Sequence, residues 1–164
     1  MYKIWGEVLK SKKHLVISVI LTLITLMIIA FIFSNSLTVA EQSDKESGAA
    51  LINIQNFLSF FKIPVKLTDA FVRKAAHFVE FFALGTMLCI TIFYYRFNQK
   101  HGLAFTPIIG LSVAITDELL QLKTQGRSAS VFDVLLDFSG VLCALLIISF
   151  IIYITNKRKK NKIE

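Results

Sequence analysis

The chain has 164 residues, of which 55% are hydrophobic and only 18% are charged. Soluble domains carry roughly a quarter charged residues, so this composition excludes an ordinary soluble domain. The net charge of +7 suggests a nucleic-acid partner, but the basic residues flank long apolar runs, and we predict no such partner. Cys89 and Cys143 lie inside these runs, where a thiol is more often a small packing residue than a disulfide partner or metal ligand.

The first predicted element is a membrane-spanning helix at about residues 15–33. No charge interrupts the run from Leu15 to Phe33. A cleaved signal peptide shares this layout, but its apolar region is usually only about 7–15 residues long. We therefore predict a retained helix, since a span needs about 20 apolar residues. The polar triplet Ser-Asn-Ser at 34–36 follows its end.

The longest connection is formed by residues 34–68. Its polar part, 41–47, predicts irregular structure. The next part predicts a short helix in the membrane interface, because polar residues surround one apolar face; a helix packed against the bundle is the alternative. That face has apolar residues at spacings of three and four: Leu51, Ile54, Leu58 and Phe61.

The second spanning helix is predicted at about residues 71–95. Thr68 is a suitable N-cap, and Asp69 suits the first turn of a helix. The deeper part of this helix carries no charge. Its first half is unusual for a membrane span because it carries four ionisable residues: Arg73, Lys74, His77 and Glu80.

The third and fourth spanning helices are predicted at about 103–122 and 131–155. The third is apolar until Asp117, Glu118 and Gln121 near its end. The fourth begins after Ser130. One face of this fourth span carries two polar residues followed by two small ones: Asp133, Asp137, Gly140 and Ala144. Small residues favour close contact between helices.

These elements predict an all-α fold: a four-transmembrane-helix bundle with a short interfacial helix between the first and second spans. We expect residues 1–164 to form a single membrane domain. Lys and Arg concentrate in the N-terminal segment, the 96–102 turn and the C-terminal tail. The positive-inside rule then places both termini in the cytoplasm.

In this topology the polar clusters of all four helices meet at the outer membrane face. Lipid does not solvate ionisable side chains, so they usually face the bundle interior or a wet cavity. We predict an outward-facing polar pocket between the second, third and fourth spans. Its candidate ligand-binding residues are Lys74, His77, Glu80, Asp117, Glu118, Gln121, Arg127, Ser130, Asp133 and Asp137.

Several of these residues also have purely structural interpretations. Arg73 and Lys74 suit interfacial anchors whose long side chains reach toward water. Ser130 and Asp133 fit a capping box at the start of the fourth span. A single histidine such as His77 is often only a hydrogen-bonded structural group. Asp137 and Glu80 fit such a role less well, because they lie about two turns inside their helices, where capping does not apply.

The chemistry of the cluster favours binding over catalysis. Arg127 and the neighbouring basic residues could hold a phosphate or carboxylate. The carboxylates could hold head-group hydroxyls, or Mg²⁺ or Ca²⁺, but their spacing matches no known metal motif, and we predict no metal or cofactor. His77 and Glu80 are the candidate catalytic residues, with His77 as a general base. No nucleophile motif accompanies them.

At these residues the chain resembles the VanZ-like family of small bacterial membrane proteins. Residues 74–81 resemble its K-x-x-H-x-x-E-Y pattern, 117–121 its D-E-x-x-Q pattern, and 126–140 its G-R-x-x-S-x-x-D-x-x-x-D-x-x-G pattern. The triplet at 34–36 lies where the family has a short Ser-rich motif. Phe81 replaces the usual Tyr, which removes a hydroxyl from the predicted pocket.

The resemblance implies a protein of the bacterial plasma membrane and cell envelope. The family is named for a factor that lowers susceptibility to teicoplanin, a lipid-tailed glycopeptide that binds cell-wall precursors. The first hypothesis is therefore a pocket that binds a lipid-linked or cell-wall-related head group. The alternatives are an intramembrane enzyme acting on such a substrate and a structural or assembly partner. The ligand, the oligomeric state and any effect on antibiotic susceptibility stay open.

Overall fold

The computed structural model describes residues 2–95 and 99–161. All regular structure in this part of the chain is helical, which confirms the predicted all-α class. The five helices are α1 (Tyr2–Ser36), α2 (Ala40–Phe60), α3 (Asp69–Tyr94), α4 (Gln99–Gln121) and α5 (Val131–Lys160).

Four of these helices contain a segment long and apolar enough to cross a membrane. The segments are Lys13–Ser36, Asp69–Tyr94, Leu103–Gln121 and Val131–Arg158. Large apolar side chains on them are exposed, for example Leu23, Ile108 and Phe150. Exposed apolar side chains of this kind suit contact with lipid rather than water. The fold is therefore that of a multi-pass membrane protein.

The helix boundaries agree with the predicted spans, and the helices are longer at some ends. Thr68 is the N-cap of α3, as predicted, and its hydroxyl oxygen accepts a hydrogen bond from the backbone N–H of Phe71 at 3.3 Å. α5 continues to Lys160, beyond the predicted end near 155, because the Lys and Arg residues after the span are good helix formers.

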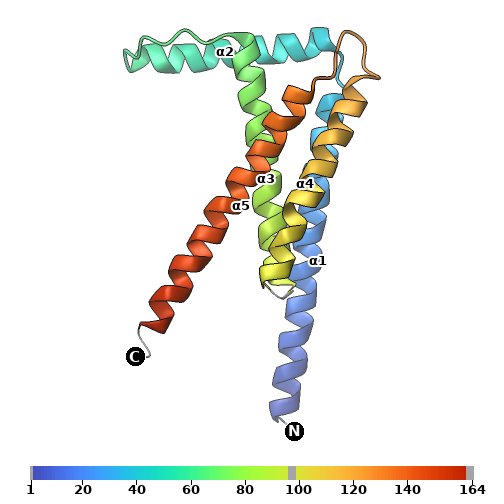
Figure 1. Ribbon diagram of the computed structural model, residues 1–164, viewed down its shortest axis with the longest axis vertical. Coiled ribbons are helices and arrows are strands. Elements are labelled where there is room, and N and C mark those ends of the chain that lie inside the picture. Colours follow the sequence, from blue (N-terminus) through green and yellow to red (C-terminus); the bar gives the residue numbers. More distant parts are fainter. Residues whose placement is uncertain (1, 96–98, 162–164) are drawn as a thin grey trace.

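The irregular structure predicted for 41–47 is wrong, because α2 is helical from Ala40 onward. Side-chain pairs four residues apart stabilise this first half: Lys45 binds Glu41 at 2.8 Å, and Gln42 donates to Glu46 at 3.0 Å. The interfacial helix is thus longer than expected. It crosses one end of the bundle at a steep angle to the other helices (Figure 1).

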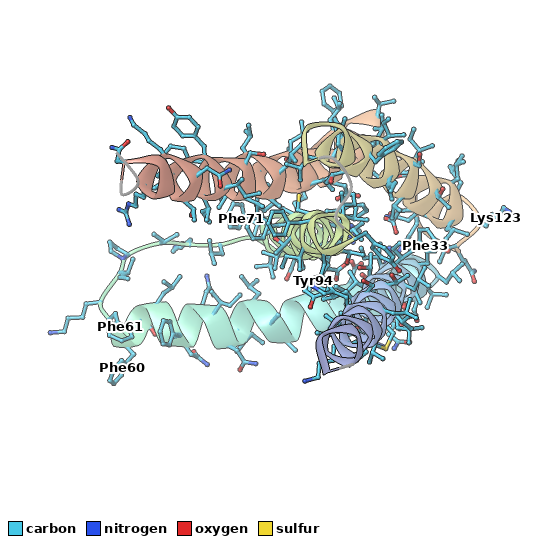
Figure 2. The ribbon with its side chains drawn as sticks, turned by 90° about the horizontal axis from the view of Figure 1, so that it is seen from below. Phe33, Phe60, Phe61, Phe71, Tyr94 and Lys123 are labelled. Atoms are coloured by element: carbon cyan, nitrogen blue, oxygen red, sulfur yellow. The ribbon has the colours of Figure 1, made fainter. Side chains whose placement is uncertain are left out.

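The second half of α2 extends beyond the bundle, and residues 61–68 run back beside it (Figure 1). Figure 2 shows Phe60 and Phe61 at the far end of α2. Both side chains are exposed, as are Phe57 and Ile52. This arrangement supports the predicted helix in the membrane interface rather than one packed wholly against the bundle.

α3 lies at the centre of the bundle and makes its most extensive contacts with α5. Small residues allow this close approach, as predicted for the stripe on the fourth span. A Cβ on Gly140 would lie 2.6 Å from the carbonyl oxygen of Phe78. Phe81, Leu84 and Val141 are fully buried at the same contact.

The two chain ends lie at the same end of the bundle, and α2 lies at the opposite end (Figure 1). The turn between α4 and α5 is also at the α2 end. Arg73, Lys74 and His77, at the start of α3, therefore lie near the end of α4 and the start of α5. This topology brings together polar residues that are far apart in the sequence.

Candidate functional site

A cavity of about 240 Å³ lies at the α2 end of the bundle. Its walls come from the first turns of α3 and α5, the last turn of α4, the α4–α5 turn and the first residue of α2. The lining residues are Ala40, Ala70, Arg73, Lys74, His77, Glu118, Gln121, Gly126, Arg127, Ser128, Asp133, Leu136 and Asp137.

Seven of the ten predicted ligand-binding residues line this cavity. The other three, Glu80, Asp117 and Ser130, do not. Glu80 faces α1, where Asn35 donates a hydrogen bond to its Oε1 atom at 2.9 Å. The Ser130 backbone N–H donates to Glu118 at 2.9 Å. Asp117 is buried behind the lining.

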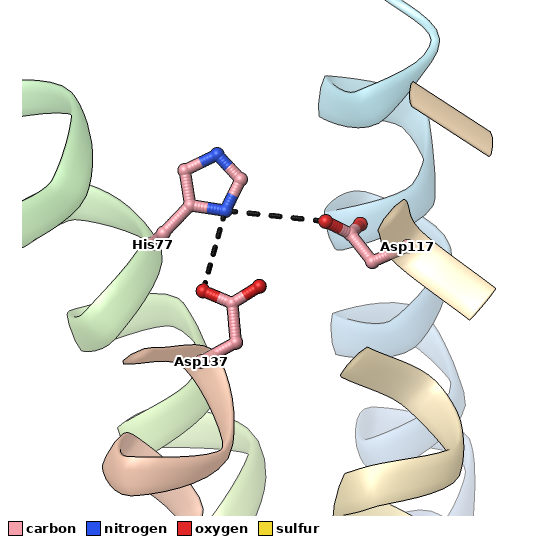
Figure 3. Close-up of side chains that lie close together, drawn as sticks. All are labelled: His77, Asp117 and Asp137. Atoms are coloured by element: carbon pink, nitrogen blue, oxygen red, sulfur yellow. Dashed lines mark ion pairs between the residues drawn. The ribbon is translucent and has the colours of Figure 1, made fainter. Parts of the chain in front are cut away.

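A buried polar cluster beside the cavity consists of His77, Asp117 and Asp137, one residue from each of α3, α4 and α5 (Figure 3). His77 Nδ1 lies 3.6 Å from Asp137 Oδ1 and 4.0 Å from Asp117 Oδ2. Both aspartates are 0% exposed, whereas the His77 side chain is 19% exposed. Burial of two carboxylates is costly unless each is paired or hydrogen-bonded.

Asp117 has donors on both carboxylate oxygens. Ser36, at the end of α1, donates its hydroxyl to Oδ1, and Gln121 donates its amide to Oδ2 at 3.0 Å. Thr124 donates its hydroxyl to the Ser36 carbonyl at 3.0 Å, so the α4–α5 turn is tied to the end of α1. The Ser-Asn-Ser triplet at 34–36 was therefore the sequence signal for these supporting contacts.

The cavity rim carries two ion pairs between elements. Lys74 lies 3.0 Å from Asp133, which joins α3 to α5, and Arg73 lies 2.8 Å from Asp44, which joins α3 to α2. Both basic residues thus pair with carboxylates of other helices, in addition to any role as interfacial anchors. The carboxylate of Asp44 was missed because its segment was expected to be irregular.

The predicted capping box at Ser130 and Asp133 does not form. A capping box needs the Asp133 carboxylate to reach back to the Ser130 N–H. Instead, Asp133 pairs with Lys74, and Glu118 of α4 accepts the Ser130 N–H. The start of α5 is therefore fixed by Glu118 of α4 together with a local cap, in which the Ser130 hydroxyl oxygen accepts the Phe132 N–H at 3.2 Å.

Arg127 lines the cavity from the α4–α5 turn. Its Nε atom is buried with no hydrogen-bond partner, and Arg127 forms no ion pair with any side chain in 13–95 or 103–158. Burial lowers the pKa of Arg127, and the nearby charge of Arg73 lowers it further. The guanidinium nevertheless stays charged at neutral pH.

The turn that carries Arg127 was only partly predicted. Gly126 has φ of 79°, a left-handed conformation that glycine adopts without strain. The preceding residue, Gln125, accepts a hydrogen bond from the backbone N–H of Ala40 at 3.3 Å. This contact brings the start of α2 to the cavity. No side-chain pattern marks Ala40, so the sequence did not indicate it.

The fold and the cavity together define a polytopic membrane protein with a polar, charged cavity at one end of its helical bundle. Residues 19–153 match the model of the family described as VanZ/LLP1, and the chain belongs to this VanZ-like family. Comparisons with curated proteins and with solved structures each gave no match.

Proposed function

We propose that this VanZ-like protein binds, in the cavity, the anionic head group of an envelope lipid or a lipid-linked cell-wall precursor. The observation that carries the proposal is the unpaired guanidinium of Arg127. Arg73 and Lys74 already have carboxylate partners at the rim. The Nε atom of Arg127 is buried without an acceptor, although the residue as a whole is half-buried. Buried polar atoms are nearly always paired, and a bound anion would supply the missing acceptor.

Phosphate and carboxylate groups fit the planar fork of arginine, which binds them through two parallel hydrogen bonds. An anion between Arg127 and Arg73 also offsets the repulsion that lowers the pKa of Arg127. A volume of about 240 Å³ suits a head group, since sites for whole drug-sized ligands span roughly 300–1,000 Å³. The lipid tail would stay in the bilayer.

The test compares binding of a polyprenyl phosphate with binding of the matching polyprenol, which lacks the anion. Native mass spectrometry of the purified protein measures both. We expect preference for the phosphate, and Arg127→Gln to weaken phosphate binding about tenfold or more, because a charged hydrogen bond contributes about 1.5–3 kcal/mol.

The matched control is Lys123→Gln. Lys123 is in the same turn as Arg127, but it is exposed, does not line the cavity and points away from the bundle (Figure 2). This change also removes one positive charge, and we expect it to leave phosphate binding unchanged. Equal binding of the phosphate and the alcohol, or equal losses in the two variants, contradicts the proposal.

The cellular consequence we propose is lowered susceptibility to teicoplanin-type glycopeptides, for which the family resemblance is the support. Expression in a Gram-positive host should raise the teicoplanin concentration needed to inhibit growth, with vancomycin tested alongside. Arg127→Gln should remove this effect at equal membrane levels, and Lys123→Gln should retain it. If well-expressed wild-type protein leaves the inhibitory concentration of teicoplanin unchanged, the proposed role in glycopeptide resistance is contradicted.

A further inference from the structure

The buried cluster of His77, Asp117 and Asp137 beside the cavity has the composition of a metal site. Each residue offers one ligand atom, and the three atoms lie within 4.8 Å of one another. They come from three different helices, so no spacing in the sequence marks them as a set. Figure 3 shows the two carboxylates directed toward the imidazole.

The charges of this cluster do not balance. Asp117 and Asp137 are both fully buried, and His77 is the single basic group within ion-pair distance of either carboxylate in the described ranges. With both carboxylates ionised, even a protonated histidine leaves one negative charge in excess. A divalent cation neutralises both carboxylates and leaves the imidazole uncharged, which is the form that binds metal.

Asp137 provides the second, independent observation. Neither of its carboxylate oxygens has a hydrogen-bond partner among the side chains described, those of 13–95 and 103–158, although Asp137 is 0% exposed. Buried polar atoms are nearly always paired. These oxygens face His77 and Asp117, so a cation at the cluster satisfies them.

Asp117, unlike Asp137, is held in a fixed orientation by hydrogen bonds from neighbouring side chains. Ser36 and Gln121 each donate to one of its oxygens and fix the carboxylate toward His77. Groups that hold a ligand in this way are typical of metal sites and strengthen metal binding. Hydrogen bonds to a carboxylate also leave it a lone pair for the cation.

We propose that His77, Asp117 and Asp137 bind a divalent transition-metal cation, with Zn²⁺ and Mn²⁺ as the best candidates. One imidazole with two carboxylates suits these ions better than Ca²⁺ or Mg²⁺, which prefer oxygen ligands alone. Ligand atoms around a tetrahedral ion are roughly 3.4 Å apart. The spacings here are 3.6 and 4.0 Å from His77 Nδ1 and within 4.8 Å for all three atoms, so binding an ion would draw the side chains inward.

Two of the three ligands, His77 and Asp137, line the cavity. Coordination positions not filled by protein therefore face the cavity and are open to water or an anionic ligand. Metal binding itself needs no head group, so this inference goes beyond the proposed function and is tested separately from it.

The test uses the full chain purified in detergent and stripped with a chelator. Equilibrium dialysis against Zn²⁺ or Mn²⁺, followed by elemental analysis, measures the bound metal. We expect about one ion per chain. Asp137→Asn and His77→Gln should each weaken binding at least tenfold, and Ser36→Ala, which removes a donor to Asp117, roughly 10–100-fold.

Glu41→Gln is the matched control, because it removes an exposed carboxylate that pairs only with Lys45 on α2. It should bind metal as the wild type does. Circular dichroism checks the folding of each variant; if Asp137→Asn does not fold, His77→Gln decides. Failure of the folded wild type to bind either ion overturns the proposal, and so does unchanged binding by the folded Asp137→Asn or His77→Gln protein.

Discussion

Lys74 and Asp133 form the ion pair that joins α3 to α5 at the cavity rim. Their side chains are 57% and 34% exposed, and ion pairs this close to water contribute little to stability. We expect the double-mutant cycle of Lys74→Met and Asp133→Asn to give a coupling energy below about 1 kcal/mol. Chemical denaturation of the purified protein measures it.

This measurement separates two roles for Asp133. If the residue only holds the helices together, Asp133→Asn should unfold the protein and abolish head-group binding at once. We expect instead a folded protein with altered binding, since Asp133 lines the cavity. A coupling energy of several kcal/mol contradicts this expectation and favours a structural role for the pair.

At the residue scale, the sequence predicted which polar residues lie near the α2 end of the bundle, but not which of them form hydrogen bonds or ion pairs with one another. His77 and Glu80 are three residues apart and so share one face of α3, yet Glu80 contacts Asn35 of α1 and does not line the cavity. Asp133 fitted a capping box with Ser130, but it pairs with Lys74 of α3 instead, and the Ser130 hydroxyl alone caps α5. Such pairings depend on helix rotation and crossing, which local spacing does not determine.

At the element scale, the contact between α3 and α5 depends on Gly140. An added Cβ would meet the backbone of α3, 2.6 Å from the Phe78 oxygen and 3.0 Å from the Phe82 nitrogen. Backbone atoms have little freedom to move aside, so we expect Gly140→Ala to destabilise the protein by about 1–3 kcal/mol. Thermal unfolding in detergent measures the change.

Gly48→Ala is the comparison for this prediction. Gly48 lies in α2, and a Cβ there would come no closer than 3.8 Å to its nearest neighbour, Asp69 Oδ1. Because alanine is the better helix former by about 1 kcal/mol, Gly48→Ala should keep or raise stability. Equal unfolding temperatures for the two variants would show that α3 and α5 are not in close contact at Gly140.

The element least well predicted was α2. Its second half has an apolar face at helical spacing, and the sequence indicated a helix there. Its first half, 41–47, is polar throughout and lacks that periodicity, so composition favoured irregular structure. Pairs such as Glu41 with Lys45 stabilise a helix without an apolar face. The four spans were predictable because bilayer thickness demands long apolar segments.

At the scale of the whole molecule, an even number of spans leaves both chain ends on one side, and Figure 1 shows them at the end opposite α2 and the cavity. The distribution of Lys and Arg predicts that this side is the cytoplasmic one. With this predicted orientation the cavity would open toward the outer leaflet, which is the side that the proposed head-group ligand requires. Orientation is therefore the property on which the proposed ligand class depends.

Single cysteines at two exposed lysines, one at each end of the bundle, test the orientation. In a Cys89→Ala, Cys143→Ala background, we expect a membrane-impermeant maleimide to label Lys123→Cys in intact Gram-positive cells. It should label Lys157→Cys only after the cells are made permeable. Both lysines are exposed, so access from the correct side decides the labelling. The reverse pattern would place the cavity in the cytoplasm, where the proposed outer-leaflet ligand does not reach it.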